Sequence, residues 1–222
     1  MTRILVDAAI DSVESAERAV REGAGRLEVC ADLSVGGLTP SRDLVDACLT
    51  LGIPCVAMAR ERAGDFVYSP TELRAIDAAA RALCDTDVAG IVFGALSGDG
   101  SVDVEFARSI VGTCAGKDVV FHRAFDRTPD PHRALDSLVE CRVTRVLTSG
   151  HAQSAFAGLS ELTDLVAKSA GRIQILPGGG VRANNVLAIV EQSGVREVHA
   201  RATEPGVIAA IVAALGSDSK NN

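Results

Sequence analysis

The sequence predicts an α/β protein of one domain, a (β/α)₈ barrel of the TIM type that spans residues 1–216, followed by a disordered C-terminal tail at 217–222. Two observations predict the barrel. Short apolar runs alternate with amphipathic segments, and this unit occurs eight times along the 222 residues. The tail, SDSKNN, is polar and has no apolar periodicity.

The apolar runs have the length and composition of buried parallel strands. Between them lie segments with apolar residues at helical spacing, for example Leu73, Ile76, Ala80 and Leu83. The expected strands are, in order, 4–6, 26–30, 55–59, 90–94, 118–122, 145–149, 172–176 and 196–200.

Helix start and stop signals fall between these strands. Ser69, Pro70 and Glu72 fit the cap, first-turn proline and capping-box positions of one helix. A doubly wound open sheet is the alternative fold, but no GxGxxG follows the first strand to favour it. Four glycines are expected to end helices just before strands: Gly23, Gly52, Gly171 and Gly194.

Composition narrows the partners and the location. A formal net charge of −7 argues against a nucleic-acid-binding surface but leaves small anionic ligands open, since a local positive cavity can coexist with an acidic exterior. No leader-like segment opens the sequence, and no apolar run approaches the ~20 residues that span a bilayer. We therefore expect a cytoplasmic protein with no membrane partner. The six cysteines show no CxxC spacing, which favours reduced, mostly buried thiols.

Polar residues concentrate at the expected carboxyl ends of the strands, where (β/α)₈ barrels carry their sites. The opposite ends show no comparable mixture. The run FHRAFD, at 121–126, contributes three such groups within six residues. Residues at or after the expected strand ends are Asp7, Glu28, Cys30, Arg60, Arg62, Asp65, His122, Arg123, Asp126, Thr148, Ser149 and His199.

Alternation along each strand predicts which of these side chains face the barrel interior. The apolar members of each pair pack on the helices, so Leu27 and Val29 point outward while Glu28 and Cys30 point inward. By the same rule Asp7, Arg60, His122, Gln174 and His199 face inward. Buried carboxylates need partners, and the arginines are expected to supply them. An ionic layer that only fills the barrel is the structural alternative.

Two glycine-bearing segments indicate an anion site. LTSG (147–150) and LPGGGV (176–181) each join a strand end to a helix start, where backbone N–H groups and the helix dipole favour a phosphate or carboxylate. The expected ligands there are Thr148 and Ser149 from the first segment and Gly178, Gly179 and Gly180 from the second. The alternative is that the glycines only make a tight turn.

Seven strings in the sequence resemble the CutC family, described as copper homeostasis proteins: RLEVCADLSVGGLTPS, RERAGDFVYS, FGALSGDG, FHRAFD, RVLTSG, LPGGGV and EVHA. The resemblance runs from about residue 4 to about residue 203. It implies a TIM-type barrel, a cytoplasmic location, a homodimer or homotetramer, and a role in copper handling with copper(I) bound through cysteine. Cys30 matches the cysteine of the family's ELC-type motif. The chain departs from the family at Asp7 and Ala9, where members carry glutamate and cysteine, and at Glu61, where they carry proline.

Copper(I) prefers sulfur ligands, and the chain offers few of them near Cys30. Cys55 begins its strand and is expected to face the helices, at a height roughly 13 to 16 Å from Cys30 given ~3.3 Å per residue. Met58 shares the inward direction of Arg60 and is a candidate thioether, and His122 or His199 could join it in a mixed site.

Two functions of different class follow, and a scaffold that binds a regulatory ligand without turnover is a third alternative that suits the polar strand ends equally well. The first is the one that the resemblance implies, a cytosolic copper-associated protein with Cys30 as the metal ligand. The second is an acid/base enzyme, a lyase, isomerase or hydrolase, acting on a small anionic or sugar-like molecule. In the second function, Glu28 or His122 is the general base or acid, and Asp7 orients or shares the proton. His199 and Arg123 join them as catalytic candidates. Arg60, Arg62, Asp65 and Asp126 complete the ligand site with the two glycine segments.

Overall fold

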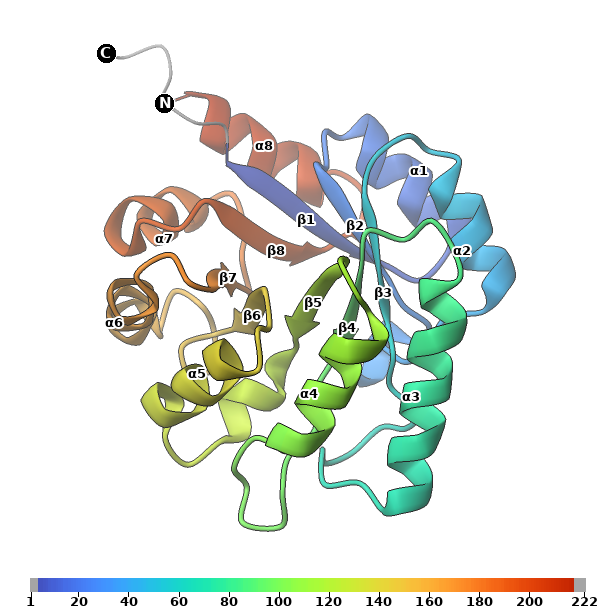
Figure 1. Cartoon of the computed structure of the whole chain (residues 1–222). Coiled ribbons are helices and arrows are strands. Elements are labelled where there is room, and N and C mark those ends of the chain that lie inside the picture. The colour runs from blue at the N-terminus through green and yellow to red at the C-terminus, as the bar shows by residue number, and fades with distance from the viewer. Residues whose placement is uncertain (1–3, 218–222) are drawn as a thin grey trace.

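The computed structural model describes residues 4–217 as eight parallel strands that alternate with eight helices (Figure 1). The strands are β1 (Leu5–Ile10), β2 (Arg26–Val29), β3 (Cys55–Met58), β4 (Gly90–Phe93), β5 (Asp118–Phe121), β6 (Arg145–Thr148), β7 (Gln174–Pro177) and β8 (Glu197–Arg201). The helices are α1 (Val13–Arg21), α2 (Arg42–Leu49), α3 (Pro70–Cys84), α4 (Val104–Thr113), α5 (Pro131–Glu140), α6 (Leu159–Ser169), α7 (Val186–Ser193) and α8 (Val207–Ser217).

The strands form one sheet in the order β7-β6-β5-β4-β3-β2-β1-β8, and every pair within it is parallel. Strands β7 and β8 lie side by side and bring the sheet round to a nearly closed barrel (Figure 1). The predicted (β/α)₈ barrel is therefore confirmed. Of the expected tail, Ser217 ends α8 and 218–222 lie outside the described residues.

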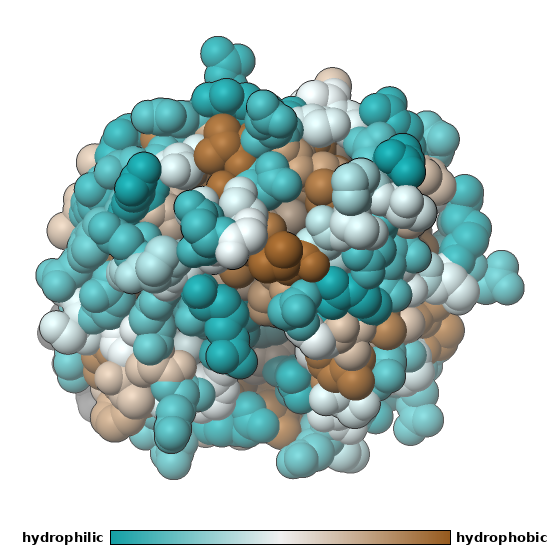
Figure 2. Space-filling model, turned by 90° about the horizontal axis from the view of Figure 1, so that it is seen from below, coloured by the Kyte–Doolittle hydropathy of each residue, from teal (hydrophilic) through white to brown (hydrophobic). Residues whose placement is uncertain are grey.

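Two apolar layers hold the barrel together. The larger lies between strands and helices and includes the outward-facing Leu27, Val29 and Cys55. The smaller fills the barrel interior with inward-facing residues, among them Cys30 and Met58. The predicted alternation therefore holds on β2 and β3. The molecule viewed from below is mostly hydrophilic, with apolar groups gathered near the centre of that face (Figure 2).

Helix ends follow the local signals in the sequence. Ser69 caps α3 and forms a reciprocal capping box with Glu72, with Pro70 in the first turn, as predicted. Gly194 ends α7 in the left-handed conformation at φ 73°. No helix within residues 4–217 is long and apolar enough to cross a membrane.

The expected first strand, 4–6, was too short. β1 continues through Ala8 and Ala9 to Ile10, so Asp7 lies inside the strand rather than after it. The charged residue interrupts the apolar run in the sequence, but its inward side chain is compatible with a strand because Arg26 and His199 pair with it.

Candidate functional site

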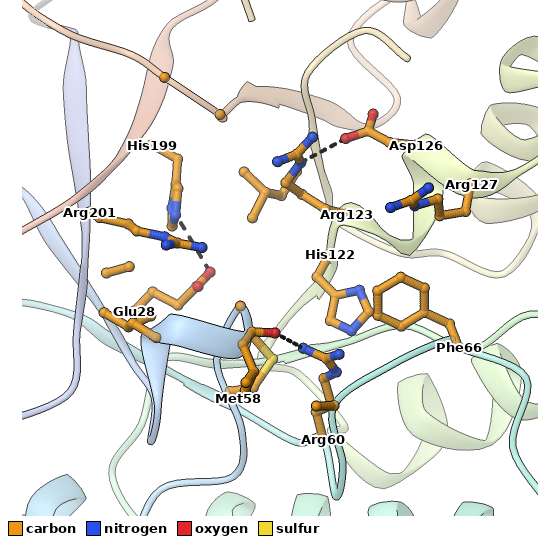
Figure 3. A pocket seen from close by; sticks show the side chains of 18 of the residues that line it. Glu28, Met58, Arg60, Phe66, His122, Arg123, Asp126, Arg127, His199 and Arg201 are labelled. Carbon is orange, nitrogen blue, oxygen red and sulfur yellow. Dashed lines mark hydrogen bonds and ion pairs between the residues drawn. The ribbon is translucent and has the colours of Figure 1, made fainter. Parts of the chain in front are cut away.

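A cavity of about 1310 Å³ opens at the carboxyl ends of the strands. Glu28 and His199 lie on one side of it and His122 and Arg60 on the other (Figure 3). Five arginines line it: Arg60, Arg123, Arg127, Arg182 and Arg201. The site predicted at the carboxyl ends of the strands is therefore an open cavity, and residues from several strands line it.

Asp7 lies below this cavity, fully buried between two partners. Its Oδ1 accepts from Arg26 Nε at 2.6 Å, and its Oδ2 lies 2.7 Å from His199 Nδ1. Burial alone would raise the Asp7 pKa, but Arg26 and His199 outweigh it and lower the pKa to about 2. Asp7 is therefore an ionised group that orients His199 and does not line the cavity itself.

His199 connects Asp7 to the cavity. With Nδ1 turned toward Asp7, Nε2 is the ring nitrogen left for a ligand, and the His199 side chain lines the cavity. Burial would lower the His199 pKa, but Glu28 and Asp7 raise it above the ordinary value. This carboxylate–imidazole arrangement is the one that fixes a histidine for proton transfer at its second nitrogen.

Glu28 is the second carboxylate near His199. Its Oε2 lies 4.0 Å from His199 Nδ1 and has no hydrogen-bond partner among the residues that the structure describes, while Oε1 accepts from Cys30 Sγ at 3.7 Å. Burial raises the Glu28 pKa, and nearby Asp7 adds to the rise. Glu28 and His199 therefore compete for a proton at the cavity wall.

His122 follows β5 and is held as a neutral ring. Its Nδ1 accepts from the backbone N–H of Ala124 at 3.1 Å, at the start of the 3₁₀ turn Arg123–Arg127. Burial and the charge of Arg60 lower its pKa to about 3. The sequence could not show that the ring sits over Phe66, with 4.9 Å between centroids.

Arg60 is a buried cation on the same wall. Its guanidinium donates to the carbonyls of Val35 at 3.0 Å and Gly37 at 3.2 Å and lies over the Phe66 ring. Among residues 4–217 no carboxylate pairs with it. Because an uncompensated buried charge is costly, Arg60 is an anion-receptive group.

Arg62 and Asp65 serve their own loop. Arg62 pairs with Glu72 and with Asp65 and stacks over Tyr68, and it does not line the cavity. Asp65 borders the cavity, but its side chain is largely exposed and is held by Arg62 at 3.0 Å. The predicted ligand role has no geometric support for Arg62, whose donors are already used by the loop.

Asp126 occupies the place expected for an anion at LTSG. Its carboxylate accepts from Thr148 Oγ1 and from the backbone N–H groups of Ser149 and His151. The N–H of Gly150 donates to Thr148 Oγ1. The LTSG donors are therefore engaged by the chain's own carboxylate, and Thr148, Ser149 and Asp126 form an internal network rather than an open cradle.

Arg123 ties this network to the second glycine segment. It donates to Asp126 at 2.8 Å and to Ser149 Oγ at 2.9 Å, and it borders the cavity. Gly179 and Gly180, with φ of 94° and 73°, also line the cavity. Gly178 does not line it, and its backbone N–H donates to the carbonyl of Thr148. An anion site at Gly179 and Gly180 stays a prediction.

Cys30 lies behind the cavity wall, fully buried beside Met58. A Cβ placed on Gly37 would lie 2.9 Å from Cys30 Sγ and 3.3 Å from Met58 Cε, so both side chains pack against that glycine. Burial and the Glu28 charge raise the Cys30 pKa well above its ordinary value. The group is a protonated thiol that donates to Glu28.

A metal ion has one further candidate set. Asp7, Glu28 and His199 each offer a ligand atom, and these atoms lie within 4.8 Å of one another. Oxygen and imidazole donors suit divalent ions rather than copper(I), which prefers sulfur. The hydrogen bond between Asp7 Oδ2 and His199 Nδ1 already joins two of these three residues without a metal.

The amino end of the barrel is not apolar, and the expectation that it carries no polar mixture was wrong. Arg26 bridges Asp7 and Glu197, with Nη2 2.8 Å from the Glu197 carboxylate. Arg145 then joins Glu197, at 3.0 Å, to Asp118. Strand alternation was the signal that predicts this, because the rule that turns Glu28 inward also turns Arg26 inward.

Comparisons with known proteins agree with this architecture. The model of the CutC family matches residues 4–204. A mouse protein, copper homeostasis protein cutC homolog, is 43% identical over 199 residues, which is 89% of this chain and 73% of the mouse protein. A CutC family protein of Vibrio cholerae is 40% identical over 205 residues, covering 90% of this chain and 81% of its own length.

Solved structures show the same fold. A crystal structure of copper homeostasis protein CutC from Streptococcus agalactiae superposes with a TM-score of 0.84 at 30% identity, covering 88% of this chain and 97% of that one. A KDPGal structure reaches a TM-score of 0.62 at 16% identity, covering 99% and 98%. That second likeness is one of fold alone.

Proposed function

The chain belongs to the CutC family, and we propose that it is an enzyme that transfers protons to and from a small anionic molecule at the barrel mouth. The observation that carries the proposal is the buried hydrogen bond of 2.7 Å between Asp7 and His199, which leaves His199 Nε2 facing the cavity. A carboxylate that fixes one imidazole nitrogen prepares the other for proton exchange.

Each residue of this group has a separate role. Asp7 holds the ring and stabilises its charged form, and Arg26 keeps Asp7 ionised. His199 Nε2 gives a proton to the ligand or takes one from it. Glu28 supplies a second site for that proton beside the same ring. Such a pair serves lyase, isomerase and hydrolase chemistry alike.

The charge distribution favours an anionic ligand. The whole chain carries a formal charge of −7, yet five arginines line this cavity. A positive cavity in an acidic protein raises the local concentration of small anions. Schiff-base chemistry has no support within residues 4–217, because Lys117 is tied to the carbonyls of Thr86 and Val88 and Lys168 to Asp136.

The test is a thermal-shift panel of phosphorylated, carboxylated and sugar-like metabolites, followed by turnover assays on the compounds that stabilise the protein. We expect His199→Gln to lower kcat by ~10²- to 10⁴-fold while the ligand still stabilises the variant. Arg196→Gln, an exposed change outside the cavity, is the control. Equal turnover by His199→Gln and wild type, or no stabilising compound in the panel, would contradict the proposal.

Copper handling is the second candidate, because copper homeostasis is the role in the names of the mouse and human relatives. The observation in its favour is that Cys30 and Met58 pack against the same glycine and could offer a thiolate and a thioether. Copper(I) titration against a chelator tests it, with Cys30→Ser expected to abolish tight binding and Cys48→Ser to leave it intact. Unchanged affinity in Cys30→Ser would rule out this site.

A cytoplasmic location and assembly as a homodimer or homotetramer complete the proposal, on family resemblance. Fractionation with a compartment marker tests the first, and light scattering of the purified chain tests the second. Recovery from the membrane fraction, or a monomer mass of 23.0 kDa, would contradict them.

A further inference from the structure

Two buried hydrogen-bond donors on one cavity wall have no acceptor. The Arg60 Nε and His122 Nε2 atoms are buried and have no hydrogen-bond partner among the described residues, and the same holds for the hydroxyl of Tyr68. Arg60 is 4% exposed and His122 is 5% exposed. Native proteins rarely leave such groups unsatisfied, so an orphaned pair calls for an explanation.

The proton on His122 can be assigned from its neighbour. A backbone N–H can only donate, so the contact of 3.1 Å from Ala124 makes Nδ1 the acceptor. The ring is neutral, because burial and Arg60 lower its pKa to about 3. Its one hydrogen is therefore on Nε2, and His122 is a donor toward any ligand, not a base.

The two donors belong to one wall. The Arg60 guanidinium lies 5.0 Å from the Phe66 ring centroid, and the His122 ring centroid lies 4.9 Å from the same ring. Both side chains line the cavity opposite His199 and Glu28 (Figure 3). The Nε–H of a cation and the N–H of a neutral ring, both without an acceptor at one wall, fit an oxygen that carries negative charge.

The fold also holds this wall in place. Gly94 follows β4 directly beneath the His122 ring, and a Cβ at that position would overlap Nδ1 and Cε1. Arg60 is fixed by carbonyls from the loop after β2 and from its own loop. Both donors are therefore preorganised, which is what stabilisation of a developing charge requires.

We propose that Arg60 and His122 form an oxyanion site for a carbonyl oxygen of the substrate, which makes the substrate a small carbonyl compound with an acidic hydrogen on the adjacent carbon. This inference rests on the proposed function, since it assigns the acceptor side of the same reaction. His199 Nε2 takes the proton from that carbon. The C–H electron pair becomes a carbon–carbon double bond, and the carbonyl π pair moves onto the oxygen that Arg60 and His122 hold. Return of the proton to the carbon that lost it regenerates the carbonyl compound. Where that carbon bears a hydroxyl, the hydroxyl proton passes to the held oxygen and the returning proton goes to the former carbonyl carbon, so the isomer forms with no oxidant or reductant.

The test uses the full chain and oxalate, a planar dianion that resembles an enediolate. We expect oxalate binding, measured by calorimetry, to weaken by ~10- to 100-fold in Arg60→Met and in His122→Leu. His122→Gln keeps an N–H near the same position and should stay within ~3-fold of wild type. Arg196→Met, outside the cavity, controls for the loss of one positive charge.

A measurement on the unmutated protein covers the case in which a variant fails to fold. Nitrogen NMR of the histidine rings should show His122 as the neutral Nε2–H form, with that signal shifted by oxalate. A His122 that carries its hydrogen on Nδ1, an oxalate affinity indifferent to Arg60, or no binding to wild type would overturn the site.

The outcomes separate this inference from the proposed function. If turnover of a panel compound depends on His199 while oxalate affinity is unchanged in the Arg60 and His122 variants, the oxyanion site is wrong and the acid/base proposal stands. If oxalate binding depends on both residues while His199→Gln keeps full turnover, the anion site stands and the proton-transfer role of His199 fails.

Discussion

The two ends of the barrel interior use buried charge in opposite ways. At the amino end, Arg26, Glu197, Arg145 and Asp118 form a chain in which each charge has an opposite partner. At the carboxyl end, no carboxylate within residues 4–217 pairs with Arg60, and Glu28 Oε2 has no hydrogen bond there and only a 4.0 Å approach to His199 Nδ1. The paired end fills and stabilises the barrel, and the unpaired end is shaped for a partner that residues 4–217 do not provide.

Removing Arg26 from the amino end should reduce stability more than any other change considered below. Arg26→Met leaves Asp7 and Glu197 buried without their shared cation, and we expect a loss of about 3–5 kcal/mol in the free energy of unfolding. Denaturant unfolding measures it. Arg42→Met, which removes an exposed i,i+4 pair with Asp46, should cost far less. Similar losses in the two variants would show that the chain at the amino end is not cooperative.

A side chain at Gly94, beside the His122 ring, should have the next largest effect on stability. Gly94→Ala forces His122 to move, and we expect a loss of about 1–3 kcal/mol together with a displaced His122 ring signal in NMR spectra. Gly98 is the matched control, because nothing lies within 4 Å of its added Cβ and alanine there should change stability by less than about 0.5 kcal/mol. An undisturbed His122 in Gly94→Ala would contradict the account of how the ring is held.

The neutral His122 should make the fold sensitive to acid. Its pKa falls from 6.5 to about 3 on folding, so between those values the unfolded chain binds a proton that the folded chain does not. Stability should therefore fall as pH decreases through this range, with a His122 share of at most about 1.4 kcal/mol per pH unit. The free energy of unfolding, plotted against pH, should change less steeply in His122→Gln than in wild type. Asp7 and His199 contribute equally to the slope in both proteins. Parallel curves would contradict a neutral His122.

The exposed arginines of the rim should matter least. Arg201 lines the cavity but is exposed, and Arg201→Gln should weaken inorganic phosphate binding by only ~2- to 5-fold, less at high salt. Calorimetry at two salt concentrations checks this. A loss as large as that expected for Arg60→Met with oxalate would place the main anion contact at the rim instead of the buried wall.

The sequence predicted the barrel and the inward direction of Glu28, Cys30 and His199, because strand alternation is a local property. It did not predict that Asp126 would fill the LTSG segment, since which acceptor satisfies a backbone N–H depends on residues brought together by folding. Asp7 was misplaced at the end of its strand for a related reason. Its tolerance inside β1 depends on Arg26 and His199, which are distant in the chain.

The most direct test of the contrast between the two histidines is a nitrogen NMR pH titration of the wild-type rings, assigned with His122→Gln and His199→Gln. We expect the pKa values of the two rings to shift in opposite directions. His122 should remain a neutral Nε2–H ring far below pH 6.5, and His199 should titrate above 6.5, with Asp7→Asn lowering its pKa. Ordinary titration of both rings near 6.5, unaffected by Asp7→Asn, would contradict the account.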